Sequence, residues 1–320
     1  MQPISIVIPV YNRAHLVTRT LESVLAQSYR PLQLVLVDND SADGTCAVLQ
    51  QFAADYSAPD FEVSVVSETR RTAGAARNRG AQYATGDWLL FFDSDDVMHP
   101  DLVQNYVNVI DKARGDVDIV SIQSTLYYED GSKRVLPFYK IDTIGVHLLH
   151  GQFATQRYIM RKEFFFQCNG WNVDLPVWED WELGIRMLLA GARVAFLSKD
   201  LVSVYHTSDS ITGDSFAGKV GQWENAMNIG EATITSSQHP DVQRFRRLLD
   251  FKRITLAAHY EAEGRSDLST PLRDEAMLSL QLSYGNSAWW RLFVKPVVNW
   301  LYRRISRGAR GSAVIARIVL

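Results

Sequence analysis

The chain has 320 residues, of which 47% are hydrophobic and 22% are charged, so it can bury a large core and is not expected to be disordered. Its formal net charge of -3 lacks the strong basic excess of proteins that wrap nucleic acid. Nucleic acid is therefore not among the expected partners.

Cysteine usage and the first residues bear on the cellular compartment. Cys46 and Cys168 lie far apart without metal-type spacing, which fits a reducing cytosol better than a disulfide-linked secreted protein. Residues 1–9 lack a basic head followed by a long apolar stretch, and no run of about 18 apolar residues occurs. We expect a cytoplasmic protein with neither a signal peptide nor a membrane-spanning helix.

The N-terminal part of the chain alternates short apolar runs with helical patterns. Strands are predicted at 4–10, 32–37, 63–66 and 88–92. A helix is predicted at 14–27, with Asn12 as its N-terminal cap. This alternation indicates a mostly parallel sheet flanked by helices, in which ligands bind beyond the carboxyl ends of the strands.

The pattern changes at about residue 115. A strand at 117–121, a hairpin around 129–132, a strand near 158–160 and a helix at 180–190 are predicted there. Beyond about residue 216 the pattern is almost wholly helical. We expect an α/β domain over 1–212, followed by a helical region over 213–320.

Polar residues follow the first two predicted strands. The first strand leads through Pro9 and Val10 into Tyr11 and Asn12. The second leads into Asp38, Asn39 and Asp40. Taken singly, such residues are ordinary turn and cap formers. Their repetition at successive strand ends favours a ligand site at that edge of the sheet.

Two further segments bring opposite charges to the same edge. Arg77 lies in a glycine-containing basic segment at 72–80 that suits a diphosphate, although a solvated loop has the same composition. The fourth strand ends in Asp93, Ser94, Asp95 and Asp96, whose clustered carboxylates repel one another. Mg²⁺ or Mn²⁺ would relieve this repulsion, because both ions prefer oxygen ligands beside substrate phosphates. An acidic turn or calcium loop is the alternative, but the spacing of an EF-hand is absent.

The segment 178–183 carries an acid between two indoles. Asp180 stands at the start of a predicted helix, and its neighbours are Trp178, Glu179 and Trp181. A helix cap is the ordinary role of such an acid. Indoles that border a sugar ring would make Asp180 a candidate general base. Because the helix dipole opposes a raised pKa, we expect this carboxylate to be ionised.

Together these motifs resemble those of the family 2 inverting glycosyltransferases of GT-A fold. The resemblance covers about residues 4–212 and rests on the order and spacing of the motifs. The motifs are Pro9-Val10-Tyr11-Asn12, Val37-Asp38, Ala76-Arg77-Asn78-Arg79-Gly80, Gly86-Asp87, Asp93-Ser94-Asp95-Asp96 and Glu179-Asp180. The resemblance implies a nucleotide-diphospho-sugar transferase fold, with a donor-binding half at about 1–115 and an acceptor half at about 116–212.

The resemblance also implies roles for single residues. Asp180 matches the catalytic base. Donor binding is implied for Pro9, Val10, Tyr11, Asn12, Asp38, Asn39, Asp40, Arg77, Asp93, Ser94 and Asp95. A divalent metal, Mn²⁺ or Mg²⁺, is implied for Asp93, Asp95 and His206. The acceptor side matches Gly170, Trp171, Trp178, Glu179 and Trp181.

One departure from the family pattern concerns the donor. Asn39 stands where many relatives carry a second aspartate, which in some of them meets a uracil edge, and an amide both donates and accepts hydrogen bonds. A UDP-sugar is the default donor, and a glycan or lipid-linked glycan in surface polysaccharide assembly is the expected acceptor. A sugar nucleotidyltransferase and a non-catalytic glycan-binding module are the alternative functions.

The tract 285–320 contains no acidic residue. Its basic residues are Arg291, Lys295, Arg303, Arg304, Arg307, Arg310 and Arg317, and they alternate with Trp289, Trp290, Phe293, Trp300 and Tyr302. Such a tract at 286–320 suits an anionic bilayer, here the inner face of the cell membrane. Packing on the catalytic domain, or a dimer contact, is the alternative. Pro296 is predicted to break or kink the helix.

Overall fold

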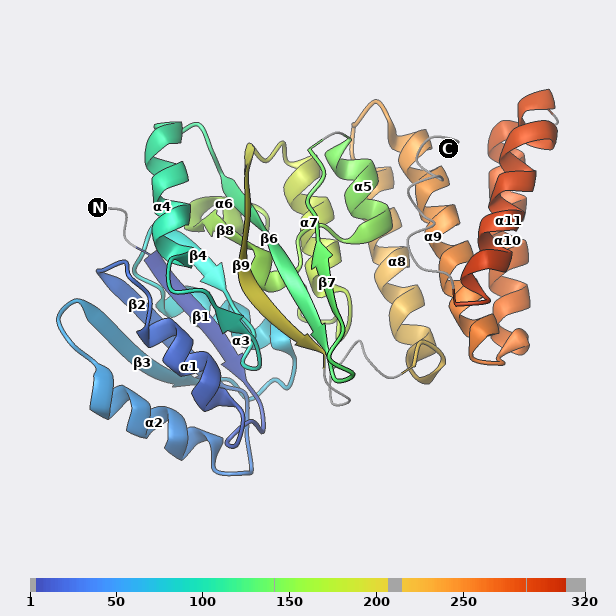
Figure 1. Ribbon diagram of the computed structural model, residues 1–320. Coiled ribbons are helices and arrows are strands. Elements are labelled where there is room, and N and C mark those ends of the chain that lie inside the picture. The colour runs from blue at the N-terminus through green and yellow to red at the C-terminus, as the bar shows by residue number, and fades with distance from the viewer. Residues whose placement is uncertain (1–3, 141, 207–214, 286, 309–320) are drawn as a thin grey trace. The chain divides into compact units, whose positions relative to one another are not determined.

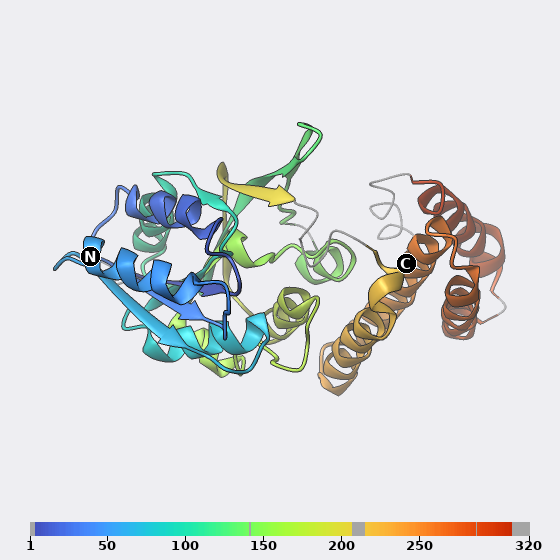
Figure 2. The same ribbon diagram turned by 90° about the horizontal axis from the view of Figure 1, so that it is seen from below.

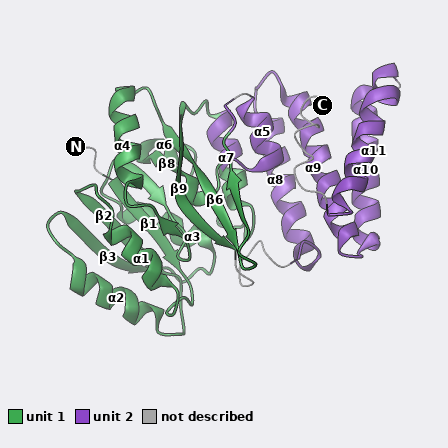
Figure 3. Cartoon of the chain, in the orientation of Figure 1, with its two compact units in different colours: residues 1–138, 153–183, 190–207 green, residues 139–152, 184–189, 208–320 purple. Residues whose placement is uncertain are grey.

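The computed structural model describes residues 4–140, 142–206, 215–285 and 287–308. The chain forms two compact units, which Figure 3 colours separately. Unit 1 comprises residues 1–138, 153–183 and 190–207, and unit 2 comprises residues 139–152, 184–189 and 208–320. The domain boundary expected at residue 212 lies outside the described residues.

Unit 1 is built around a sheet whose first part is parallel (Figure 1). It contains β1 (Ile4–Val10), β2 (Leu32–Asp38), β3 (Phe61–Ser67) and β4 (Trp88–Phe91) in the order β3-β2-β1-β4. The pairings among these strands are parallel, so their carboxyl ends lie at one edge. These are the strands predicted from continuous apolar runs, which arise because a parallel sheet is buried on both faces.

The second part of the sheet is mixed. β8 (Tyr158–Arg161) pairs antiparallel with β4 and with β6 (Ile119–Tyr128), whereas β9 (Val194–His206) runs parallel to β6. β5 (Val97–Met98) and β7 (Lys133–Leu136) add antiparallel pairs to β9 and β6, and the β6–β7 turn is the predicted hairpin. The expectation of a mostly parallel sheet therefore holds for β1 to β4. It does not hold for the second part of the sheet, because β8 runs in the opposite direction to its neighbours.

Helices cover both faces of the parallel strands (Figure 2). α1 (Val17–Leu25) and α2 (Thr45–Tyr56) share a core with one face, and α3 (Ala73–Tyr83) packs on the other. The chain moves along the sheet in one direction from β1 to β3 and returns in the other direction to β4. Right-handed crossovers therefore place α3 on the face opposite to α1 and α2. The remaining helices of this part are α4 (Leu102–Ala113), α6 (Lys162–Gln167) and α7 (Glu179–Leu189), whose last six residues belong to unit 2.

The N-terminal cap predicted for α1 is wrong. Leu16 occupies the cap position, and no side chain caps the helix. Asn12 instead adopts a positive φ of 48°, and its Oδ1 accepts a hydrogen bond from the backbone N of Ala42 at 2.9 Å. The Asn12 side chain therefore ties the loop after β1 to the loop after β2, and α1 begins later than predicted.

Unit 2 is helical, as predicted for the residues beyond 216. Its elements are α5 (Thr143–His150), α8 (Val220–Ser236), α9 (Val242–Ala262), α10 (Ser266–Tyr284), a π-helical turn η3 (Trp290–Val294) and α11 (Lys295–Ile305). Pro296 lies in the first turn of α11, directly after the π-helical turn η3, so no regular α-helix runs unbroken through this proline. Among the described helices, none combines the length and apolarity needed to cross a membrane.

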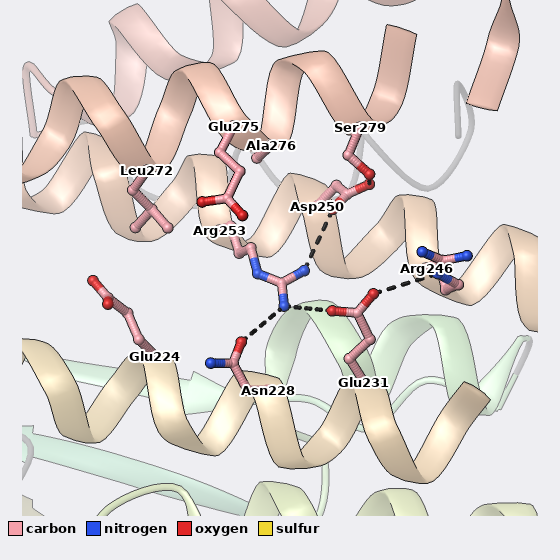
Figure 4. Close-up of a pocket in the computed structure, with 10 residues that line it drawn as sticks. All are labelled: Glu224, Asn228, Glu231, Arg246, Asp250, Arg253, Leu272, Glu275, Ala276 and Ser279. Carbon is pink, nitrogen blue, oxygen red and sulfur yellow. Dashed lines mark hydrogen bonds and ion pairs between the residues drawn. The ribbon is translucent and has the colours of Figure 1, made fainter. Parts of the chain in front are cut away.

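A polar cluster around Arg253 joins the helices of unit 2 (Figure 4). Its guanidinium donates to Glu231 at 2.6 Å and to Asn228 at 3.2 Å, both on α8, and contacts Asp250 on α9. Burial raises the pKa of Asp250 to about 6, although a hydrogen bond from Ser279 on α10 opposes the rise. The cluster therefore links α8, α9 and α10 through charge-assisted hydrogen bonds.

Gly80→Ala tests the close packing of α3 on the sheet. A Cβ at Gly80 would lie 2.3 Å from Val7 Cγ1 and 3.0 Å from Val37 Cγ2, so overpacking is expected to lower the unfolding free energy by about 1–3 kcal/mol. The matched control is Gly221→Ala in α8, where no described atom lies within 4 Å of the new Cβ and helix propensity is expected to add about 0.5–1 kcal/mol. Urea unfolding measures both changes, and a Gly80→Ala variant as stable as wild type would contradict the packing argument.

Candidate active site

The ends of β1 and β2 bring the first set of expected donor-binding residues together. Pro9 and Val10 end β1, and Val10 pairs with Asp38 at the end of β2. Tyr11 follows with 44% of its surface exposed, and the Arg71 guanidinium lies 5.9 Å from the centre of its ring. The Tyr11 ring is therefore open to a ligand at the carboxyl edge of the sheet.

Asp38, Asn39 and Asp40 have three different environments. Asp38 is buried, yet its Oδ1 has no hydrogen-bond partner among the described residues. The Asn39 amide Nδ2 donates to the backbone carbonyls of Glu68 at 2.9 Å and Arg70 at 2.8 Å. Asp40 forms an exposed ion pair with Arg71 at 2.7 Å. Since a buried unpaired oxygen is costly, the Oδ1 of Asp38 offers an acceptor to a ligand N–H or O–H.

The acidic turn after β4 carries charge that the protein neutralises only in part. Burial and the charge of Asp93 raise the pKa of Asp95, while Arg13 and Arg19 oppose the rise. The Nη2 of Arg19 also donates to the backbone carbonyl of Asp95 at 2.6 Å. Ser94 lies half-buried between the two aspartates. A cation at this turn would stabilise the ionised form of Asp95.

Asp96 has a structural position in the same turn. It is buried, and its Oδ1 accepts a hydrogen bond from the backbone N of Tyr205 in β9 at 2.9 Å. Its Oδ2 accepts one from the Gln156 amide, and its backbone carbonyl accepts one from Thr20 in α1 at 2.8 Å. Burial, then the charges of Asp93 and Asp95, raise its pKa well above the usual range. Asp96 therefore fastens the acidic turn to β9 and α1.

Arg77 joins the acidic turn to the start of α7. Its Nη2 donates to Asp93 at 2.7 Å, and its Nη1 donates to Glu179 at 2.8 Å. The guanidinium lies 4.7 Å from the ring centre of Trp171, and only 5% of the side chain is exposed. Burial alone would lower the pKa of Arg77, but the charges of Asp93 and Glu179 raise it above its usual value. The arginine expected near the diphosphate is thus a buried bridge between two acids.

Asp180 follows Glu179 directly in the first turn of α7. Its Oδ1 accepts a hydrogen bond from the backbone N of Trp181 at 2.7 Å. Burial, followed by the charge of Glu179, raises the pKa of Asp180 to about 7, although that hydrogen bond and Arg77 oppose the rise. The helix dipole therefore does not prevent a raised pKa, because burial and a neighbouring charge outweigh it.

The expected acceptor-side tryptophans differ in exposure. Trp171 and Trp181 are each 2% exposed, whereas Trp178 is half-buried and lies 5.7 Å from Trp181 between ring centres. Gly170 has a φ of 62°, and a Cβ there would lie 2.7 Å from the Asn78 Oδ1. Asn78 accepts a hydrogen bond from the backbone N of Trp171 and donates one to its carbonyl, each at 2.8 Å. Trp178 is thus the most exposed of these three indoles, and Trp171 packs in the core.

The expected metal ligands do not form a ready three-residue cage. His206 ends β9, one residue after Tyr205, and its ring lies 5.5 Å from that of Tyr128. Within the described ranges, no three acidic, histidine or cysteine side chains gather closely enough to hold a metal ion. Hard divalent cations often bind through one or two carboxylates and substrate phosphates, so this arrangement fits a metal that arrives with a ligand.

Some residues of the site carry no sequence signal. Arg19 lies in α1, and its guanidinium stacks 3.9 Å from the ring centre of Tyr205 while it contacts the acidic turn. Gln156 reaches Asp96 from the turn before β8. Both residues lie at least 60 positions from the aspartates they contact, so no local pattern could single them out.

Replacing Arg77 tests the bridge. Arg77→Met removes the shared partner of Asp93 and Glu179, and breaking a buried ion pair from one side is expected to cost about 3–5 kcal/mol. The matched control is Arg70→Met, whose ion pair with Asp174 has side chains 50% and 76% exposed and is worth at most about 1 kcal/mol. Urea unfolding measures both, and equal small losses would show that the bridge does not stabilise unit 1.

Comparison with known proteins places this geometry in a family. The model of Glycosyl transferase family 2 matches residues 5–171. The amylovoran biosynthesis glycosyltransferase AmsB of Erwinia amylovora is 25% identical over 278 residues, which cover 82% of this chain and 86% of AmsB.

Solved structures share the fold. The crystal structure of S. aureus TarS 1-349 in complex with UDP-GlcNAc has a TM-score of 0.70 at 14% identity and covers 99% of this chain and 90% of its own. The mannosyltransferase PcManGT from Pyrobaculum calidifontis, in complex with GDP-Man and Mn2+, has a TM-score of 0.58 at 19% identity and covers 99% and 87%. The expected GT-A fold is confirmed. Because the family model matches more than half of the 320 residues, the chain belongs to glycosyl transferase family 2 and is a glycosyltransferase.

Proposed function

We propose that this glycosyltransferase inverts the anomeric centre of a nucleoside diphosphate sugar as it transfers the sugar to an acceptor hydroxyl. The observation that carries the proposal is the Arg77 bridge, which holds Asp93 of the acidic turn and Glu179, the neighbour of Asp180, on one guanidinium. Arg77 thereby holds the acidic turn, where the donor diphosphate would bind, close to Asp180, the candidate base. Such proximity is what a single displacement needs.

The donor is proposed to bind with its nucleoside at the loops after β1 and β2. Supporting observations are the unpartnered Oδ1 of buried Asp38 and the exposed ring of Tyr11, which suit a base N–H and a base face. The pocket would then be shaped by Pro9, Val10, Asn12, Asn39 and Asp40. A UDP-sugar is the first donor to test, because the TarS structure of similar fold holds UDP-GlcNAc.

The diphosphate is proposed to lie at the acidic turn with a divalent cation. The raised pKa of Asp95 and the net negative charge of the turn support a cation there. Asp95, with Asp93 and His206 as further ligands, would hold Mn²⁺ or Mg²⁺ beside the phosphates, and PcManGT of similar fold was solved with Mn2+. When bound, such an ion neutralises charge on the leaving diphosphate. Arg13 and Arg19 supply further positive charge near Asp95.

Asp180 is proposed to be the general base. The acceptor oxygen forms a bond to the anomeric carbon, its proton passes to the Asp180 carboxylate, and the bond to the diphosphate breaks on the opposite face. A pKa of about 7 suits a base that works near neutral pH. Trp178, Glu179 and Gly170 would line the acceptor side. The acceptor is proposed to be a growing surface polysaccharide or a lipid-linked glycan at the inner face of the cell membrane, as the name of AmsB suggests for polysaccharide assembly.

A donor panel tests metal and nucleotide together. The compounds to test are UDP-GlcNAc, other UDP-sugars and GDP-Man. A nucleotide sugar that serves as donor is expected to raise the melting temperature of the protein, and to raise it more in the presence of Mn²⁺ than in the presence of a chelator. Asp95→Asn is expected to lose the metal-dependent part of that shift, whereas Asp60→Asn, at an exposed position in unit 1, is expected to keep it. A metal-independent response in wild type, or an unchanged one in Asp95→Asn, would remove the metal from the proposal.

The pH dependence of transfer tests the base. The carboxylate form is the active one, so kcat/KM is expected to rise with pH through a midpoint near 7. Glu179→Gln removes a charge that raises the pKa of Asp180 and frees Arg77, so its midpoint is expected at lower pH. Asp180→Asn is expected to bind the donor but lose transfer by about 1,000-fold or more. Full transfer by Asp180→Asn, or a midpoint that rises in Glu179→Gln, would sink the assignment.

A further inference from the structure

We propose that one face of η3 and α11 binds the surface of an anionic lipid bilayer. This aromatic–basic face consists of Trp289, Phe293, Trp300, Arg303, Arg304 and Arg307. Binding at this face would bring the enzyme to the membrane-side acceptor proposed above. Only this biological purpose rests on the proposed function. Lipid binding itself depends on this face alone.

The opposite face of the same helix is already packed. Trp290, Val294, Val298, Leu301 and Ile305 are between 0% and 7% exposed. The hydroxyl of Tyr302 lies 2.8 Å from that of Ser269 in α10, which fixes the rotation of α11 within unit 2. The helix therefore buries a full apolar stripe without help from the aromatic–basic face.

The rings of the aromatic–basic face are exposed. Trp289 is 48%, Phe293 is 51% and Trp300 is 45% exposed, and the adjacent Leu292 is 67% exposed. Trp289 and Phe293 stack with ring centres 4.7 Å apart. Large apolar side chains gathered at helical spacing on a solvent-facing stripe typically mark an interaction site. Their contribution to folding is small, because the inner stripe already holds the helix.

The charges on this segment point to an anionic partner. No Asp or Glu occurs from Gly285 to the last residue, and Arg291 and Lys295 flank the face. The Arg304 guanidinium lies 5.0 Å from the ring centre of Trp300, so cation and indole occupy the same part of the surface. Indoles settle at the depth of lipid headgroups, and arginines bind headgroup phosphates.

The dimensions favour a helix that lies on the membrane. α11 runs from Lys295 to Ile305, and no helix within the described ranges is suited to cross a bilayer. A short helix that is apolar and aromatic on its outer stripe, with basic residues beside it, inserts only to the boundary between headgroups and acyl chains. The inner stripe stays in unit 2, so binding needs no unfolding of α11.

Vesicle flotation of the full chain tests this proposal. Wild type is expected to float with vesicles of phosphatidylglycerol and phosphatidylcholine, less so at high salt, and not with phosphatidylcholine alone. Arg303→Gln, Arg304→Gln and Arg307→Gln combined are expected to weaken binding roughly 100-fold, because each basic residue near an anionic surface contributes roughly fivefold. Trp289→Gln, Phe293→Gln and Trp300→Gln combined are expected to abolish flotation at moderate salt.

A matched control removes equally exposed rings elsewhere. Tyr56, Tyr83 and Phe166 in unit 1 are 46%, 44% and 45% exposed, and replacing all three by Gln is expected to leave flotation unchanged. Circular dichroism confirms that each variant is folded. Equal flotation of wild type and the aromatic variant, or equal loss in the control, would overturn the proposal. Because flotation requires no donor, its result stands apart from any failure to detect sugar transfer.

Discussion

The candidate active site depends on one buried guanidinium. Arg77 lies in α3, Asp93 follows β4, and Glu179 begins α7, so the contacts span 16 and 102 positions of the chain. An uncompensated charge in a buried position costs several kcal/mol, so each of the three segments stabilises the native position of the other two. The sheet supplies the frame, and this bridge fixes the position of the acidic turn after β4 relative to the start of α7.

The bridge also distributes charge across the site. Arg77 compensates Asp93 and Glu179, while Asp95, Asp96 and Asp180 keep raised pKa values because burial and like charges act on them. Both carboxylate oxygens of Asp96 accept hydrogen bonds, one from the backbone N of Tyr205 and one from the Gln156 amide. In the proposed mechanism Asp95, with Asp93 as a further metal ligand, acts toward the phosphates, and Asp180 acts toward the acceptor.

Much of the fold could be predicted because its signals are local. The apolar runs of β1 to β4, the β6–β7 hairpin and α7 appear as periodicity and turn chemistry within a few residues. The cap role predicted for Asn12 is wrong because a capping side chain cannot be distinguished from one that ties two loops together until the partner loop is known. The contacts of Arg19, Arg77 and Gln156 with the acidic turn depend on long-range packing, which no local pattern encodes.

The amide of Asn39 holds the shape of a loop beside the proposed nucleoside site. Its Nδ2 holds the carbonyls of Glu68 and Arg70, the segment that leads from β3 toward α3. An aspartate at this position would set a carboxylate against two carbonyl oxygens and push the loop away from β2. Replacement of Asn39 by aspartate is therefore expected to alter this loop as well as the proposed nucleoside site. If the nucleoside binds there as proposed, a carboxylate at residue 39 requires a new path for residues 68–70 as well.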